Sequence, residues 1–177
     1  LREQLDLPLV LARLGLDLFH APHFTAPLAC PVPLVATIHD LIPLHEPLLG
    51  RLGTAYVRLM ATRLVPAASQ AILTVSGATR DDLVAHGVPA SLVEVTYPGV
   101  DPAFADAVPA STAAALLARL GLTPGYLLHV GQWKPHKNVA VLLRAMAALA
   151  AEAPTGLDLP PLVLLGKPDE RHDIRPL

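Results

Sequence analysis

Basic residues gather at one turn of the chain, inside the segment Tyr126–Leu149, which reads YLLHVGQWKPHKNVAVLLRAMAAL. An apolar run ends at Gly131, Lys137 follows in a short turn, and Asn138 opens a second apolar stretch. No Asp or Glu occurs in residues 107–151, so an anion meets little repulsion there. A strand that turns through a glycine into a helix offers backbone N–H groups to an anion. The turn therefore predicts a phosphate site.

Two residues of this turn support that prediction. Gly131 has no Cβ, so the backbone can approach a ligand closely. Lys137 stands at the start of a helix, where its positive charge opposes the helix dipole. This position costs a few tenths of a kcal/mol of stability unless an anion binds. The alternative is a solvated lysine on a surface turn. The glycine spacing and the terminal Lys-Ser/Thr of a P-loop do not occur here.

Other strand ends carry polar residues that suit ligand binding. His39 and Asp40 follow an apolar run, and this pair can exchange a proton or bind a hydroxyl. The alternative is that His39 is an ordinary loop histidine and Asp40 an aspartate that only forms a turn. Ser76 precedes a helix and Gly99 follows a strand. Simple capping of the helix is the alternative role of Ser76. The histidines lack the spacing of a closed zinc site, so we expect no metal.

Apolar runs alternate with helical patterns along the whole chain. We expect strands over residues 17–20, 33–38, 70–75, 93–97, 126–130 and 160–165, and helices over 1–14, 50–65, 77–86, 111–121 and 138–151. Ser76, Ser111 and Asn138 are predicted N-caps. The strands lack strict alternation, which favours a parallel α/β fold with sheets covered on both faces. Ligands of such sheets bind beyond the carboxyl ends of the strands.

Composition and the position of prolines limit the possible partners, cellular compartment and domain boundary. The chain has 177 residues, 53% of them hydrophobic and 16% charged, with a net charge of −2, so nucleic acid is not an expected partner. The single cysteine, Cys30, is expected to be a small buried hydrophobe in a reducing compartment. No stretch reads as a membrane span or a signal peptide. A proline-containing loop over residues 99–110 predicts a boundary near residue 108.

Six motifs in order then resemble a known family. The series D-L-F-H-A-P, T-I-H-D-L-I-P-L, L-T-V-S-G-A-T-R-D-D-L, Y-P-G-V-D-P-A-F, Y-L-L-H-V-G-Q-W-K-P-H-K-N and L-V-L-L-G resembles the retaining GT-B glycosyltransferases of family 4. The H-D-L-I-P-L form is similar to mannosyltransferase-like members. The resemblance implies two Rossmann-like parallel-sheet domains, both incomplete here. Residues 1–108 would end the N-terminal, acceptor-side domain, and residues 109–177 would begin the C-terminal, donor domain.

The resemblance also implies roles for residues of the donor domain. Lys137 would hold the donor diphosphate, with Gly131 and the helix end at Asn138 shaping that site. Gly166 would lie near the nucleotide. Family members often carry Arg where this chain has Gln132, which removes one charge-assisted phosphate contact.

In the other domain, the resemblance implies that His39, with Asp40 beside it, lies near the transferred sugar. Gly99 would lie in the cleft by the crossover between domains, and Ser76 would face the donor through the N–H groups of its helix. The glycine-rich loop of the acceptor-side domain should precede residue 1. The paired-glutamate E-x₇-E segment of the donor domain should follow residue 177. We therefore expect the central part of a longer enzyme.

The implied reaction moves mannose or a related hexose from a nucleotide-sugar such as GDP-mannose to a glycan or lipid-linked acceptor. The donor is a substrate, and no cofactor is expected. A cytoplasmic protein with peripheral contact to the inner membrane face fits such an acceptor. Two alternatives stay open: a non-catalytic module that binds a nucleotide or sugar, and another enzyme of similar fold, such as a sugar-nucleotide epimerase.

Overall fold

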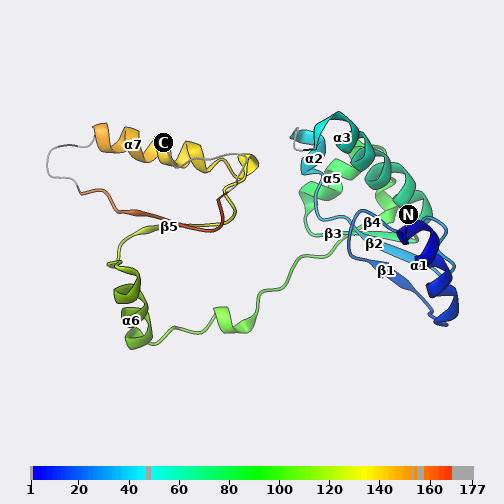
Figure 1. The fold of residues 1–177 in the computed structure, drawn as a ribbon, viewed down its shortest axis with the longest axis horizontal. Coiled ribbons are helices and arrows are strands. Elements are labelled where there is room, and N and C mark those ends of the chain that lie inside the picture. The colour runs from blue at the N-terminus through cyan, green and yellow to red at the C-terminus, as the bar shows by residue number, and fades with distance from the viewer. Residues whose placement is uncertain (1, 47–48, 153, 155–157, 169–177) are drawn as a thin grey trace. The chain divides into compact units, whose positions relative to one another are not determined.

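The computed structural model describes residues 2–46, 49–152, 154 and 158–168 and divides the chain into two compact units (Figure 1). The first unit is Leu1–Val100 and the second is Asp101–Leu177. The predicted boundary at residue 108 falls further along, just before the first long helix of the second unit. Each unit is described by itself below.

The first unit is built on a four-stranded parallel sheet. Its strands are β1 (Phe19–Ala21), β2 (Leu34–Thr37), β3 (Ala71–Thr74) and β4 (Val93–Val95), and they lie in the order β1-β2-β3-β4. Ile72 at the centre pairs with Ala36 on one side and Val93 on the other. The predicted parallel architecture is confirmed, and each strand overlaps a predicted one.

One helix precedes the sheet, and the others lie between β2 and β3 and between β3 and β4. They are α1 (Arg2–Arg13), α2 (Ile42–His45), α3 (Gly50–Leu59), α4 (Val65–Ala68) and α5 (Gly77–Ala85). A π-helical turn, Met60–Leu64, joins α3 to α4 without a break. Pro66 has no N–H to donate to the carbonyl of Thr62, so the α-helical ladder is interrupted at this point in any case. The helix predicted over residues 50–65 therefore exists but is longer and carries a π turn.

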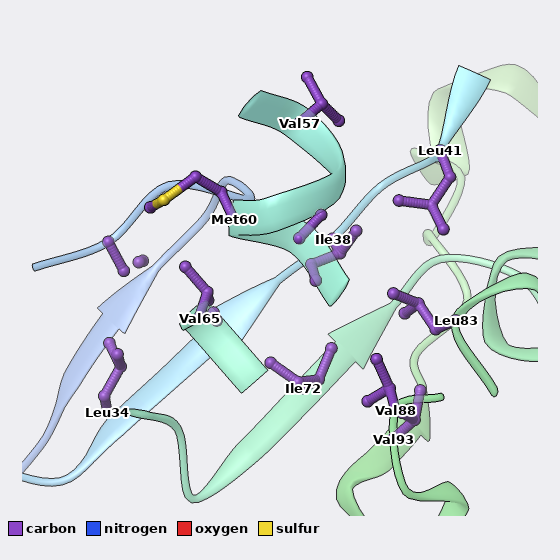
Figure 2. Packing of buried hydrophobic residues seen from close by; sticks show 14 residues of the cluster. Leu34, Ile38, Leu41, Val57, Met60, Val65, Ile72, Leu83, Val88 and Val93 are labelled. Atoms are coloured by element: carbon purple, nitrogen blue, oxygen red, sulfur yellow. The ribbon is translucent and has the colours of Figure 1, made fainter. Parts of the chain in front are cut away.

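The core of the first unit lies between these helices and the sheet (Figure 2). Its largest fully buried side chains include Leu34, Ile38, Val57, Ile72 and Leu83. Crossovers between parallel strands are right-handed, and the strand order runs in one direction, so α3 and α5 are expected on the same face of the sheet. Residues of both helices line one cavity, as this topology requires. Cys30 is a half-buried free thiol packed against the core.

In the second unit, the described residues form one pair of parallel strands. After a 3₁₀ turn (Pro102–Phe104), its elements are α6 (Ala110–Leu120), β5 (Leu127–Val130), a second 3₁₀ turn (Pro135–Lys137), α7 (Val139–Glu152) and β6 (Leu162–Leu165). β5 pairs with β6 in parallel along its whole length. Within the described residues, no helix is long and apolar enough to cross a bilayer.

The predicted helix cap at Ser111 is wrong, whereas Asn138 immediately precedes α7 as predicted. α6 begins at Ala110 after Pro109, so Ser111 lies inside the first turn and caps nothing. Proline fixes its own φ at a value that suits a helix start, which explains the earlier beginning. Asn138 adopts a left-handed conformation, with φ 51°, and ends the 3₁₀ turn. Its backbone carbonyl, rather than its side chain, accepts from the N–H of Val141.

The prediction of sheets covered on both faces fails in the second unit. Leu127, Val130 and Leu165 are 45%, 66% and 59% exposed, and Val139 is the one buried hydrophobic residue among those described in this unit. Parallel strands are normally buried on both faces. Two strands with α6 and α7 are too few elements to provide that cover.

Candidate functional site

In the first unit, the polar pair predicted after β2 lies where the sheet ends. Ile38 is fully buried, whereas His39 and Asp40 are exposed. The Nε2 of His39 lies 3.3 Å from the carbonyl oxygen of Pro22. The Oδ1 of Asp40 accepts from the N–H of Ile42 at 3.1 Å. Asp40 therefore holds the turn that leads into α2, and its other carboxylate oxygen remains for a ligand.

A cavity of about 220 Å³ opens beside this pair. His39 and Asp40 form part of its wall, together with His23, Phe24, Pro43 and Val57. The imidazole of His23 stacks on Phe24 with ring centroids 4.2 Å apart. Two imidazoles, a carboxylate and an aromatic ring are suited to hold a hydroxyl-bearing ligand such as a sugar. Sequence reasoning did not identify His23 or Phe24 as site residues, because both lie in an irregular loop far from His39 in sequence.

Ser76 is brought close to His39 through one intermediate residue. The Oγ of Ser76 accepts from the N–H of Thr79 at 3.2 Å, which confirms the predicted N-cap of α5. The hydroxyl of Thr79 in turn donates to the carbonyl oxygen of His39 at 3.1 Å. Both residues therefore lie at the carboxyl ends of the neighbouring strands β2 and β3. The cap role uses the side chain of Ser76.

Two of the other histidines of this unit have partners of their own. His20 Nε2 lies 2.8 Å from the hydroxyl of Thr37, and His45 Nε2 lies 2.6 Å from Asp82 Oδ2. Within the part of the chain that the structure describes, no three His, Cys, Asp or Glu side chains gather in a way that could hold a metal ion.

Gly99 lies beyond the end of β4 in an exposed segment. A Cβ added there would meet nothing within 4 Å apart from its chain neighbours. The residue is open to a ligand or to another part of the protein, and its proposed place in a cleft stays a prediction.

In the second unit, two predicted glycines meet at the carboxyl ends of β5 and β6. A Cβ at Gly166 would overlap the carbonyl oxygen of Gly131, so the two backbones are in direct contact. The N–H of Gly131 donates to Leu165 O at 2.9 Å, and that of Trp133 donates to Lys167 O at 3.1 Å. The pairing of the strands therefore continues into the two loops. It creates a strand end with no side chain at its centre, where a ligand can approach the backbone.

The basic turn follows this strand end directly. Gln132, Lys134, Lys137 and Asn138 are all exposed. The N–H of Lys137 donates to Lys134 O and that of Asn138 to Pro135 O, at 2.9 and 3.0 Å. These two amides are thus used inside the turn. The first turn of a helix has N–H groups without intrahelical acceptors, so anion binding at α7 falls to the amides that come after Asn138.

Three side-chain nitrogens around the turn are buried without a hydrogen-bond partner among the described atoms. They are His129 Nε2, Trp133 Nε1 and His136 Nδ1. Buried polar groups are normally paired, so each of these is available to a ligand or to another part of the protein. The sequence showed only that Trp133 is the single tryptophan; its unpartnered N–H emerges from the fold.

The family model for Glycosyltransferase Family 4 matches residues 1–104, which is more than half of the chain. The chain belongs to Glycosyltransferase Family 4. The match covers the whole first unit, including His39, Asp40, Ser76 and Gly99. No curated protein matches the sequence significantly.

Solved structures with a similar fold include Anabaena Alr3699/HepE in complex with UDP. The identity is 21%, the TM-score is 0.65, and the match covers 88% of this family 4 chain and 41% of HepE. The complex of HepE with UDP and glucose gives 22% identity and a TM-score of 0.67, covering 88% of this chain and 40% of HepE. This chain thus spans about two fifths of the length of these structures. At this identity the likeness establishes the fold, which is the predicted α/β fold with parallel sheets of the GT-B type.

Proposed function

We propose that this family 4 protein transfers a hexose from a nucleotide-sugar to a glycan or lipid-linked acceptor with retention of anomeric configuration. The second unit binds the donor, and the first unit binds the acceptor beside His39. Mannose is the proposed sugar, because the H-D-L-I-P-L motif is similar to that of mannosyltransferase-like members. The proposed setting is the cytoplasm, with peripheral contact to the inner membrane face.

The observation that carries the proposal is the meeting of Gly131 and Gly166 next to the basic turn. Two parallel strands end there without side chains, and Lys134 and Lys137 follow within the same loop. Ligands of open parallel sheets bind at such strand ends. Membership in a glycosyltransferase family, and the UDP and UDP-glucose bound in HepE structures, support a nucleotide-sugar as this ligand.

The chemistry of transfer explains why cations are needed there. Breaking the anomeric C–O bond develops negative charge on the leaving diphosphate. Lys137 and the free amides at the start of α7 would stabilise that charge more strongly in the transition state than in the ground state. His39 and Asp40 would position the sugar hydroxyls. No carboxylate of this chain is proposed as a nucleophile.

Replacing Lys137 tests the proposed donor site. In the full-length protein, Lys137→Ala is expected to weaken nucleotide-sugar binding by about 1.5–3 kcal/mol, as for the loss of a charged hydrogen bond. Arg119→Ala, which removes one positive charge from α6 of the same unit, is the matched control. Calorimetric titration with GDP-mannose and UDP-glucose measures both. Equal affinity of Lys137→Ala and the wild type for both donors would sink the assignment.

A second candidate is a module of the same fold that binds a nucleotide or sugar without catalysis. It is favoured by Gln132, which stands where family members often carry Arg and so removes one phosphate contact. Titration with GDP, UDP and ADP, followed by a turnover assay with labelled donor, separates the two. Binding without any transfer or hydrolysis supports the module, and transfer with retained configuration supports the enzyme.

A further inference from the structure

A second, larger cavity in the first unit is not used by the proposed donor or sugar sites. It has a volume of about 910 Å³ and runs between the α2–α3 segment and the C-terminal end of α5. Its lining includes the charged residues Glu46, Arg51, Arg58 and Arg63 and the imidazoles of His45 and His86. We call it the arginine groove.

The three arginines come from one continuous helical run. Arg51 and Arg58 lie two turns apart on α3, so they share one face of the helix. Arg63 comes from the π turn, and it lines the same groove together with Thr62. The Nη1 of Arg63 donates to the carbonyl oxygen of His86 at 3.0 Å, which fixes it against the end of α5.

These positive charges are not neutralised within the described structure. The salt bridges found among its residues are His45–Asp82 and Arg80–Asp81. Residues 49–80 contain no Asp or Glu, and Glu46 is the one acidic residue in the groove lining. On α5, Asp82 is held by His45 and Asp81 by Arg80. Three guanidinium groups therefore face one acid across a cavity, which is a field that attracts anions.

The groove adjoins the pocket of His39 and Asp40. Pro43 forms part of the wall of both cavities, and Asp40 accepts a hydrogen bond from Ile42 immediately before it. A ligand whose hydroxyl end lies beside His39 could extend past Pro43 toward Arg58. The remaining groove wall is apolar or hydroxyl-bearing, with Leu44, Thr54 and Ala55 among its residues.

We propose that the arginine groove binds the phosphate group of a phosphorylated acceptor. Guanidinium groups match phosphate oxygens with paired N–H donors, and Arg51 and Arg58 are exposed and unpaired with any described carboxylate. The phosphate belongs either to a soluble sugar phosphate or to a lipid headgroup. Its assignment to the acceptor rests on the proposed transferase function, whereas phosphate binding by the groove does not.

Titration of the full chain with inorganic phosphate, followed by amide NMR, tests the groove. Saturable shifts are expected at groove residues, and Arg58→Ala should weaken binding about tenfold or more. Arg58→Lys keeps the charge but loses the paired donors, so its phosphate affinity should lie between those of the wild type and Arg58→Ala. Arg13→Ala, an equal charge change on exposed α1 outside the groove lining, is expected to bind as the wild type does. Spectra of each variant without phosphate check that it is folded.

Vesicles distinguish the two sources of phosphate. For a lipid headgroup, the chain should sediment with phosphatidylglycerol vesicles and not with phosphatidylcholine, and Arg51→Ala/Arg58→Ala should abolish this. For a soluble sugar phosphate, phosphate binding should persist without sedimentation. The proposal is overturned if neither probe binds, or if Arg13→Ala weakens binding as much as Arg58→Ala. Nucleotide-sugar affinity of the Arg58 variants should stay unchanged, so failure of the donor site would be seen separately.

Discussion

Individual residues at the strand ends determine what can bind there. The contact between Gly131 and Gly166 leaves the end of the β5–β6 pair without side chains, and both residues have positive φ values of 155° and 159°. Any side chain at Gly166 would push against the backbone of Gly131. The same glycines that fit a ligand-binding role are therefore also required by the packing of the two loops.

Gly166→Ala is expected to destabilise the second unit by about 1–3 kcal/mol, because the added methyl group overlaps a carbonyl oxygen that cannot easily move. Gly99→Ala is the control, since its Cβ meets no atom within 4 Å beyond its chain neighbours. Amide hydrogen exchange of β5 and β6 measures the effect. Unchanged protection in Gly166→Ala would show that the backbone contact is absent in solution.

Ser76 is the second residue whose role can be separated from ligand binding. Ser76→Ala removes the acceptor of the Thr79 N–H and should lower the free energy of unfolding by about 0.5–2 kcal/mol. Ser76→Asp should restore most of it, because Asp is an equally good N-cap. Urea unfolding measures both, with exposed Ser91→Ala as control. A Ser76→Ala variant as stable as wild type would mean that the cap contributes nothing.

At the scale of elements, the helical run from α3 through α4 packs against the core with one face and lines the arginine groove with another. Val57, Met60 and Val65 are buried against the sheet, whereas Leu52 is 88% exposed. The arginines face the groove that this run shares with α5. One helical run therefore serves the core with one face and the groove with another.

Two leucine truncations test this division of faces. Leu83→Ala in α5 is expected to lower the free energy of unfolding by about 2–5 kcal/mol, since Leu83 is fully buried. Leu52→Ala on α3 is expected to change it by about 0.5 kcal/mol or less. Thermal and urea unfolding of the two variants give the comparison. Similar losses from both would mean that the face carrying Leu52 is covered in solution.

At the scale of the whole molecule, the two units differ in how much core they possess. The main cluster of buried hydrophobic residues, from Ala21 to Val93, lies wholly within the first unit. The segment between the units is exposed, with Tyr97 at 76%, Phe104 at 83% and Val108 at 65%. Stability should therefore be concentrated before residue 100.

Limited digestion with chymotrypsin tests this distribution. Early cleavage is expected after Phe104, leaving a persistent fragment that contains the four-stranded sheet, because this aromatic residue is exposed and lies outside the strands. Phe104→Ala should remove this cut. Mass spectrometry identifies the products. Initial cleavage between β2 and β4 would contradict the proposed order of stability.

The sequence by itself determined the alternation of strands and helices, the parallel α/β class, and the placement of His39, Ser76, Gly131 and Gly166 at strand ends. These features depend on local patterns and on glycine, which act over a few residues. It failed at Ser111, because α6 begins one residue earlier, after Pro109, and it did not show that Asn138, which precedes α7, has a left-handed conformation.

Only the tertiary structure decided which distant residues meet. His23 and Phe24 join His39 across the sheet edge, Thr79 links Ser76 to His39, and the arginines of α3 face the end of α5. Such meetings depend on strand order and crossover handedness, which are settled by packing of the whole unit rather than by neighbours in sequence. The chemistry of each residue was therefore readable from its type, whereas its partners were fixed by the fold.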